Sequence, residues 1–302
     1  KASDSLSKYY FNQSEFNKAN NVLTETYAGD KLNDAIYQNA KQAVTNLCKN
    51  KATKSNGEKL ADKIILIIME SIDNARNKDL PELFRRIART HERAQRDDDV
   101  IKTYELMAKR LGMNDTIRGK IANWHSSKER YSKAKEIFAQ FEDKTNGLKN
   151  IAQIWMRQKQ PKQAVQIYDR LIKTAPDNIT NWKIAIAEIY SSAKDYEKAI
   201  DVYRELVSLA PAKASDWYWA IGGIYEKTKM LKLAIQSYRN SDNYPQAYFQ
   251  MAKCHRKLEE YNEALILYKQ ALATESAASD ATIAIGYTYE EQSNKNNAIK
   301  WF

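Results

Sequence analysis

The chain has 302 residues, a net charge of +10, and a sequence that is 43 % apolar. This length suits two ordinary domains or one elongated body, and the apolar content is enough to bury a sizeable core. The 8 glycines and 5 prolines are few, which favours helix over strand. The longest apolar run, Ile64 to Met69, is far too short to span a bilayer, so we expect a soluble protein with no transmembrane segment.

The first 80 residues predict two irregular helical units. Residues 1–33 contain a small residue, Ala19, followed by Leu23, and predict a short unit of helices. Residues 34–80 predict one long unit, in which a polar loop over residues 49–59 precedes an apolar helix.

A repeat begins after residue 80. From position 100 onward, a small residue is followed four positions later by an aromatic ring, and we call the small residue the anchor of its unit. The anchor–ring pairs are Val100–Tyr104, Ala134–Phe138, Ala164–Tyr168, Ala199–Tyr203, Ala234–Tyr238, Ala264–Tyr268 and Ala298–Phe302. Anchors are spaced by 34, 30, 35, 35, 30 and 34 residues. A period in this range indicates a stacked array of short units.

A second pattern precedes each anchor. Nine residues before it lies a flat ring, at His91, His125, Trp155, Tyr190, Tyr225, His255 and Tyr289. Twelve residues before it lies another small residue, such as Ala187 or Gly222. Each unit is therefore predicted to be two amphipathic helices, A and B, that approach closely at the small residues and fill the remaining space with rings.

This pattern resembles that of the tetratricopeptide repeat family, most clearly at Ala199, Tyr203 and Pro211. The resemblance implies an all-α fold, a right-handed superhelical solenoid of stacked antiparallel helix pairs with a concave inner surface. It covers residues 81–302 strongly and residues 1–33 more weakly, while residues 34–80 diverge. The expected units of the array are 81–114, 115–144, 145–179, 180–214, 215–244, 245–278 and a partial unit at 279–302.

Catalysis is not expected in this chain. Its three histidines, His91, His125 and His255, all occupy the ring position of separate units, where they replace tyrosine or tryptophan. The sequence has no glycine-rich phosphate loop and no CxxC, HExxH or GxSxG motif. We therefore predict no enzyme activity, no metal site and no cofactor.

The inner surface predicts a partner-binding groove. The resemblance implies that helix A lines the groove, and the position fifteen before the anchor is apolar at Ile184, Trp219, Phe249 and Ile283. Tyr287 lies one turn beyond Ile283, and Lys253 and Arg256 lie on the rim. An apolar groove suits a peptide or helix of another protein, so the leading interpretation is a non-catalytic interaction scaffold within a larger protein or assembly. The net charge favours an acidic partner.

A basic stripe supports an alternative function. Arg85, Arg89 and Arg93 are spaced four residues apart, which places them on one face of a helix. They could bind the phosphates of RNA or another anion. Base-by-base reading of nucleic acid is disfavoured, because unit lengths vary from 30 to 35 residues.

Another alternative is a regulatory repeat domain attached to an enzyme. The sequence starts at Lys1 rather than Met, which indicates a processed or truncated start and leaves a signal peptide untested. It stops at the ring position Phe302 without a polar cap, so we expect the native chain to continue. The partner, the compartment and the oligomeric state are not determined by the sequence.

Overall fold

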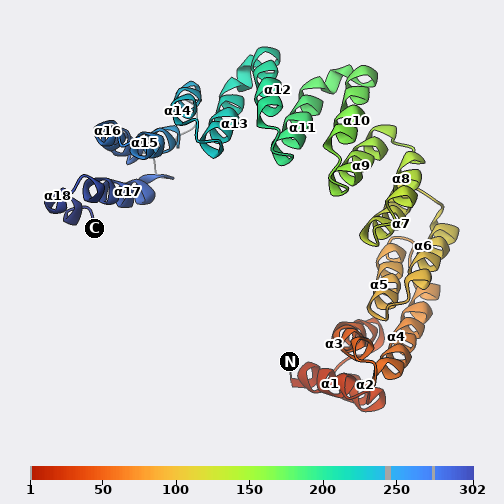
Figure 1. Ribbon diagram of the computed structural model, residues 1–302. Coiled ribbons are helices and arrows are strands. Elements are labelled where there is room, and N and C mark those ends of the chain that lie inside the picture. The colour runs from red at the N-terminus through yellow and green to blue at the C-terminus, as the bar shows by residue number, and fades with distance from the viewer. Residues whose placement is uncertain (1, 242–245, 274–275) are drawn as a thin grey trace. The chain divides into compact units, whose positions relative to one another are not determined.

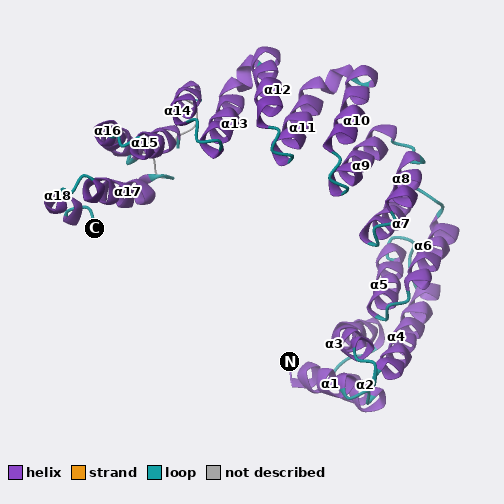
Figure 2. Cartoon of the chain, in the orientation of Figure 1, coloured by secondary structure: helices purple, strands orange, loops and turns teal. Residues whose placement is uncertain are grey.

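The computed structural model describes residues 2–241, 246–273 and 276–302. These residues form eighteen α-helices and two short 3-10 helices, with no strand among them (Figure 2). The fold is therefore all-α, as expected. The chain divides into two compact units, residues 1–147 and residues 148–302, and the boundary falls within α9.

The first unit contains four complete helix pairs (Figure 1). Their helices are α1 (Ala2–Asn12), α2 (Phe16–Thr24), α3 (Gly29–Lys49), α4 (Lys54–Asn74), α5 (Leu80–Arg93), α6 (Asp97–Leu111), α7 (Asp115–Ser127) and α8 (Tyr131–Ala139). Helix α9 (Lys144–Arg157) begins in this unit. Within each pair the second helix folds back along the first, so the pair can bury one face of each helix.

The second unit continues the same architecture. Its remaining elements are α10 (Pro161–Thr174), η1 (Pro176–Asn178), α11 (Ile179–Ser192), α12 (Tyr196–Leu209), η2 (Pro211–Lys213), α13 (Ala214–Lys227), α14 (Leu231–Asn240), α15 (Ala247–Lys257), α16 (Tyr261–Ala271), α17 (Ala278–Glu291) and α18 (Lys295–Ile299). The expected unit boundary at residues 244 and 245 lies outside the described residues.

The anchor residues lie in the core of the helix pairs. Ala199 is fully buried and Tyr203, one turn later, is 9 % exposed. The same burial recurs at Ala134, Ala164, Ala234 and Ala264. Gly222, the small residue twelve before the anchor Ala234, lies close to the following helix, because a Cβ built there would lie 2.7 Å from the ring of Tyr238. The small residues therefore let the rings of the following helix reach the backbone of the preceding one.

A left-handed residue ends the first helix of nearly every pair. Its φ is near +60° although it is never glycine, and it always lies five residues before the anchor. The residues are Ser14, Gln95, Glu129, Lys159, Lys194, Lys229, Glu259 and Ser293. The next residue donates its backbone N–H back to the carbonyl of the ring position, as Asp195 does to Tyr190 at 2.9 Å. This is a Schellman motif, which satisfies carbonyls at the helix end and reverses the chain.

The first helix pair has this same turn. Ser14 has a φ of 64°, and the backbone N–H of Glu15 donates to the carbonyl of Tyr10 at 2.9 Å. Ala19 is fully buried, five residues after Ser14. Helices α1 and α2 therefore share the hairpin geometry of the later units, although their sequence departs from the pattern.

The polar loop in the divergent segment is shorter than expected. We expected a loop over residues 49–59, but α3 runs to Lys49 and α4 begins at Lys54, so only residues 50–53 join them. The polar residues that follow Thr53 occupy the exposed first turns of α4, where they need not be buried. The hydroxyl of Thr53 donates to the carbonyl of Leu47 at 2.9 Å, which closes this loop without a left-handed residue.

A proline and a tryptophan organise the junctions between successive pairs. After α10, Pro176 starts the 3-10 turn η1, and after α12, Pro211 starts η2. The Trp182 indole N–H donates to the carbonyl of Ala175 at 3.1 Å, and its ring lies 6.1 Å from that of Tyr168. Trp217 occupies the same place one unit later and stacks on Tyr203 at 6.2 Å.

Candidate functional site

Five of the seven predicted groove residues line one pocket in the second unit. We call it the apolar pocket, and its volume is about 280 Å³. Its lining residues are Phe249, Lys253 and Arg256 from α15, Tyr268 from α16, and Asp280, Ile283, Ala284 and Tyr287 from α17. The pocket therefore lies where the first helices of two successive pairs pass over the second helix between them.

The floor of the apolar pocket is aromatic. The ring of Phe249 lies 5.4 Å from that of Tyr268, which is 1 % exposed. Burial raises the pKa of the Tyr268 hydroxyl to about 12, so this side chain stays neutral. Ile283 and Tyr287 are 48 % and 49 % exposed, and they offer apolar surface to a ligand. The Tyr287 ring is held edge-on against Phe302 at 5.2 Å.

Positive charge borders the pocket on the α15 side. Lys253 and Lys257 both donate to the same oxygen of Glu226, each at 2.8 Å. Burial disfavours the charged form of Glu226, but the two lysines outweigh it and lower the pKa of this carboxyl below its ordinary value. Two lysines share one carboxylate, which leaves a net positive charge here. Arg256 reaches Glu291 at 3.5 Å.

The other two predicted groove residues are not in the apolar pocket. Trp219 is half-buried with its ring 5.2 Å from that of Tyr238, and Ile184 is half-buried against the core of the second unit. Both therefore pack within the helix stack. The small residue Gly222 explains the position of Trp219, because it lets the Tyr238 ring come up beside it.

The three arginines of the predicted basic stripe have different surroundings. Arg85 pairs with Glu82 on its own helix, and Arg93 donates to the hydroxyl of Tyr37 on α3 at 3.4 Å. Arg89 lies between them and is exposed. Its neighbour Arg86 pairs with Asp34 at 2.8 Å and packs over the ring of Tyr37.

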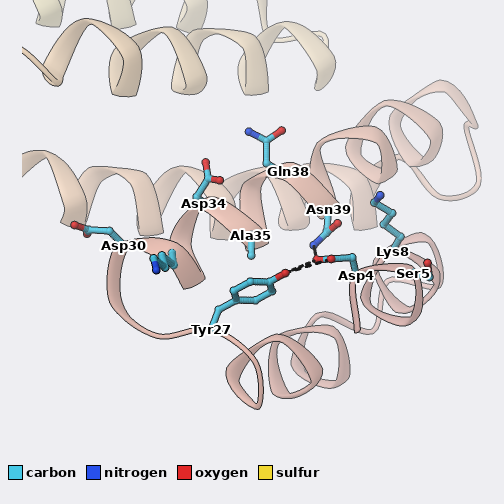
Figure 3. Close-up of a pocket in the computed structure, with 10 residues that line it drawn as sticks. Asp4, Ser5, Lys8, Tyr27, Asp30, Asp34, Ala35, Gln38 and Asn39 are labelled. Atoms are coloured by element: carbon cyan, nitrogen blue, oxygen red, sulfur yellow. Dashed lines mark hydrogen bonds between the residues drawn. The ribbon is translucent and has the colours of Figure 1, made fainter. Parts of the chain in front are cut away.

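Sequence reasoning missed two features of these surfaces. Tyr268 was assigned only to the core, yet one side of its ring forms the pocket floor, and no periodic signal separates these roles. A second pocket of about 760 Å³ lies in the first unit, where Tyr27 and Asn39 donate to the carboxylate of Asp4 at 3.2 and 3.0 Å (Figure 3). The hydrogen bond from Asn39 is the main cause that lowers the pKa of Asp4.

Family comparison matches three stretches of the second unit. Models described as tetratricopeptide repeat match residues 150–178, 183–213 and 247–282. Each stretch contains one anchor of the repeat, at Ala164, Ala199 and Ala264. The chain carries tetratricopeptide repeats.

Solved structures with some similarity include other tetratricopeptide repeat proteins. A crystal structure of MamA superposes with a TM-score of 0.42 at 18 % identity, covering 50 % of this chain and 90 % of MamA. MamA from Desulfovibrio magneticus RS-1 gives 0.43 at 17 % identity, covering 53 % and 92 %. YrrB, described as a TPR protein with an unusual peptide-binding site, gives 0.38 at 20 % identity, covering 57 % and 88 %. No curated protein matches the sequence.

The three histidines occupy the ring positions of three different helix pairs, on α5, α7 and α15. Burial lowers the pKa of both His91 and His125, and their Nδ1 atoms are buried without a hydrogen-bond partner. His255 instead contacts Glu260 at 2.6 Å. Within the described residues, no cluster of three or more His, Cys, Asp or Glu side chains could hold a metal ion. None of the described helices is both long and apolar enough to cross a membrane.

Proposed function

We propose that this chain is a protein-interaction scaffold that binds a peptide or helix of a partner protein in the apolar pocket between α15 and α17. The supporting observation is that Phe249, Ile283 and Tyr287 line one pocket, in which Ile283 and Tyr287 are about half exposed. A pocket of about 280 Å³ takes one or two apolar side chains of a ligand rather than a whole helix face. The pocket therefore supplies an anchor point within a longer contact.

The charged residues around the pocket indicate which charges the ligand should carry. Lys253 and Lys257 are both paired with the single carboxylate of Glu226, which leaves one positive charge in excess. A carboxylate of the ligand can neutralise this charge on the α15 side of the pocket. Arg256 lies one turn from Lys253 and offers a planar donor group. Asp280 lies on the opposite lip and disfavours a second acidic group there. The favoured ligand has an apolar side chain with an acidic residue on one flank.

Peptide selection followed by affinity measurement tests this proposal. A random peptide library displayed on phage is selected against the full chain, and the enriched peptides are titrated by fluorescence polarisation. We expect apolar–acidic peptides, and we expect the double variant Ile283→Ser, Tyr287→Ser to bind them at least about tenfold more weakly, because each buried apolar side chain contributes ~1.5–3 kcal/mol. Both residues are half exposed, so the melting temperature should change little.

The matched control is Ile266→Ser. Ile266 lies on α16, is 60 % exposed and does not line the apolar pocket. It should leave peptide affinity unchanged. The proposal is wrong if the enriched peptides bind the double variant and the wild type equally. A separate variant, Lys253→Gln, should weaken binding only for peptides that carry the acidic residue.

A further inference from the structure

The first unit contains another pocket, which is basic and lies at the C-terminal ends of α3 and α5. It has a volume of about 380 Å³ and is lined by Thr45 and Lys49 of α3, by Arg89, Glu92 and Arg93 of α5, and by Gln95 in the turn that follows. Thr45 and Lys49 are four residues apart, as are Arg89 and Arg93, so each helix presents two of these side chains on one face. Three of the six lining residues are cations.

The cations of this pocket make no ion pair with a described carboxylate, unlike the other arginines of the first unit. The first unit has nine arginines. Seven make an ion pair with a carboxylate: Arg76, Arg85, Arg86, Arg96, Arg110, Arg118 and Arg130. Arg89 and Arg93 make none with any described residue, and both line this pocket. Lys49, the third cation, also has no carboxylate within 4.0 Å among the described residues.

We propose that this pocket binds the phosphate group of a phosphomonoester, such as a phosphorylated side chain of a partner protein. Two guanidinium groups and one ammonium group supply charge and several donors to a tetrahedral dianion, and the planar guanidinium matches two phosphate oxygens at once. The Thr45 hydroxyl and the Gln95 amide add neutral donors. Glu92 lies on the same wall, and with the three cations it leaves the pocket with a net charge of +2, which a phosphate dianion can balance.

The site suits one phosphate better than a nucleic-acid strand. A strand would need cations that continue beyond the pocket, but Arg85 and Arg86 in the preceding turn are already paired with Glu82. The unpaired cations are thus confined to the C-terminal ends of α3 and α5. A single phosphorylated group is the ligand that this limited cluster can neutralise.

A purely structural explanation exists for two of the three cations. Lys49 and Arg93 are the last residues of α3 and α5, and cations stabilise the negative end of a helix. Arg89 is one turn earlier and exposed, so this explanation does not cover it. The two explanations differ in what they predict for variants. Helix stabilisation predicts a lower melting temperature in any buffer, and phosphate binding predicts a loss of affinity.

Calorimetric titration of the full chain with O-phosphoserine, serine and acetate, at constant ionic strength, tests the site. We expect heat of binding from O-phosphoserine alone. The variants Arg89→Gln and Lys49→Gln, both at exposed positions, should each lower its affinity about tenfold, because each removes a charge-assisted hydrogen bond. Their melting temperatures without ligand should stay close to that of the wild type. Arg110→Gln, which removes a paired arginine elsewhere in the unit, should retain full affinity.

Three outcomes would overturn the proposal. O-phosphoserine fails to bind, or it binds the Arg89→Gln and wild-type proteins equally, or the variants lose melting temperature without losing affinity. A 12-nucleotide RNA provides a further arm. Tight RNA binding that depends on Arg89 and falls steeply with salt would assign the pocket to nucleic acid instead.

Discussion

At the scale of single residues, two adjacent glycines of α13 have opposite surroundings. A Cβ at Gly222 would lie 2.7 Å from two ring atoms of Tyr238, which is 3 % exposed and cannot move aside. A Cβ at Gly223 would meet only the Tyr238 hydroxyl, at 3.9 Å. Both are helical, so alanine gives both the same gain in helix propensity. The two substitutions therefore isolate the cost of the close approach.

We expect Gly222→Ala to be less stable than Gly223→Ala by about 1–3 kcal/mol, the usual cost of overpacking a core. Urea unfolding followed by circular dichroism measures the difference. Gly223→Ala should itself equal or exceed the wild type in stability, because alanine favours helix by about 1 kcal/mol over glycine. Equal stability of the two variants would show that the Tyr238 ring does not require a glycine at position 222.

At the scale of elements, the junctions between helix pairs depend on an equivalent tryptophan in two successive units. Trp182 donates its indole N–H to the carbonyl of Ala175, while the indole N–H of Trp217 is buried without a hydrogen-bond partner. Both side chains are 7 % exposed and pack on a tyrosine of the preceding helix. Replacing Trp182 with phenylalanine therefore removes a hydrogen bond, whereas replacing Trp217 with phenylalanine removes a buried donor that has no partner.

Trp182→Phe should cost about 1 kcal/mol more in unfolding free energy than Trp217→Phe. Chemical unfolding of the two variants under identical conditions gives the comparison, and the loss of ring volume is common to both. If Trp217→Phe proves the more destabilising of the two, the hydrogen bond to Ala175 does not stabilise the junction.

The helix pairs could be predicted from spacing, but their closing turns could not. Ala199 and Tyr203 lie four residues apart because that distance is one helical turn, and this alone predicts both helix and burial. The residues five before the anchors are serine, glutamine, glutamate or lysine, none of which is typical of a left-handed conformation. Their conformation follows from the Schellman hydrogen bonds around them, which leave no mark in the side-chain pattern.

At the scale of the whole molecule, a stack of helix pairs transmits a local defect only to its neighbours. Phe84 on α5 is 1 % exposed in the first unit, and Leu206 on α12 is fully buried in the second. Truncation of either to alanine costs roughly 2–5 kcal/mol. We expect Phe84→Ala to lower hydrogen-exchange protection in helices of residues 1–147, and Leu206→Ala to lower it in those of residues 148–302.

Hydrogen exchange measured by mass spectrometry gives this pattern directly, and each variant is the control for the other. A uniform loss of protection along the whole chain in either variant would show that the two units unfold as one cooperative body. The result also decides whether the apolar pocket on α15 and α17 and the basic pocket at the C-terminal ends of α3 and α5 can be altered independently.

The candidate site could be predicted only in part from the sequence. Phe249, Ile283 and Tyr287 recur at fixed distances from their anchors, so their common face could be predicted. Trp219 has the same register as Phe249, and both are half-buried against the tyrosine of the following helix, yet only Phe249 lines the apolar pocket. Register fixes the direction of a side chain, while the shape of the surface around it depends on the residues of the neighbouring helices. Lys49 shows the same limit, since its approach to Arg89 depends on the packing of α3 against α5.

The left-handed residues that close the hairpins are positions where substitution can change the stability of the protein. Each holds a non-glycine side chain in a conformation that costs roughly 1 kcal/mol, and seven of the eight are exposed. Glycine at any one of them would relieve that strain and leave the helices unchanged. Substitutions at these positions would therefore change the unfolding free energy of the chain in small steps. Of the eight residues, Gln95 alone lines either proposed binding pocket, so the other seven can vary without altering those pockets.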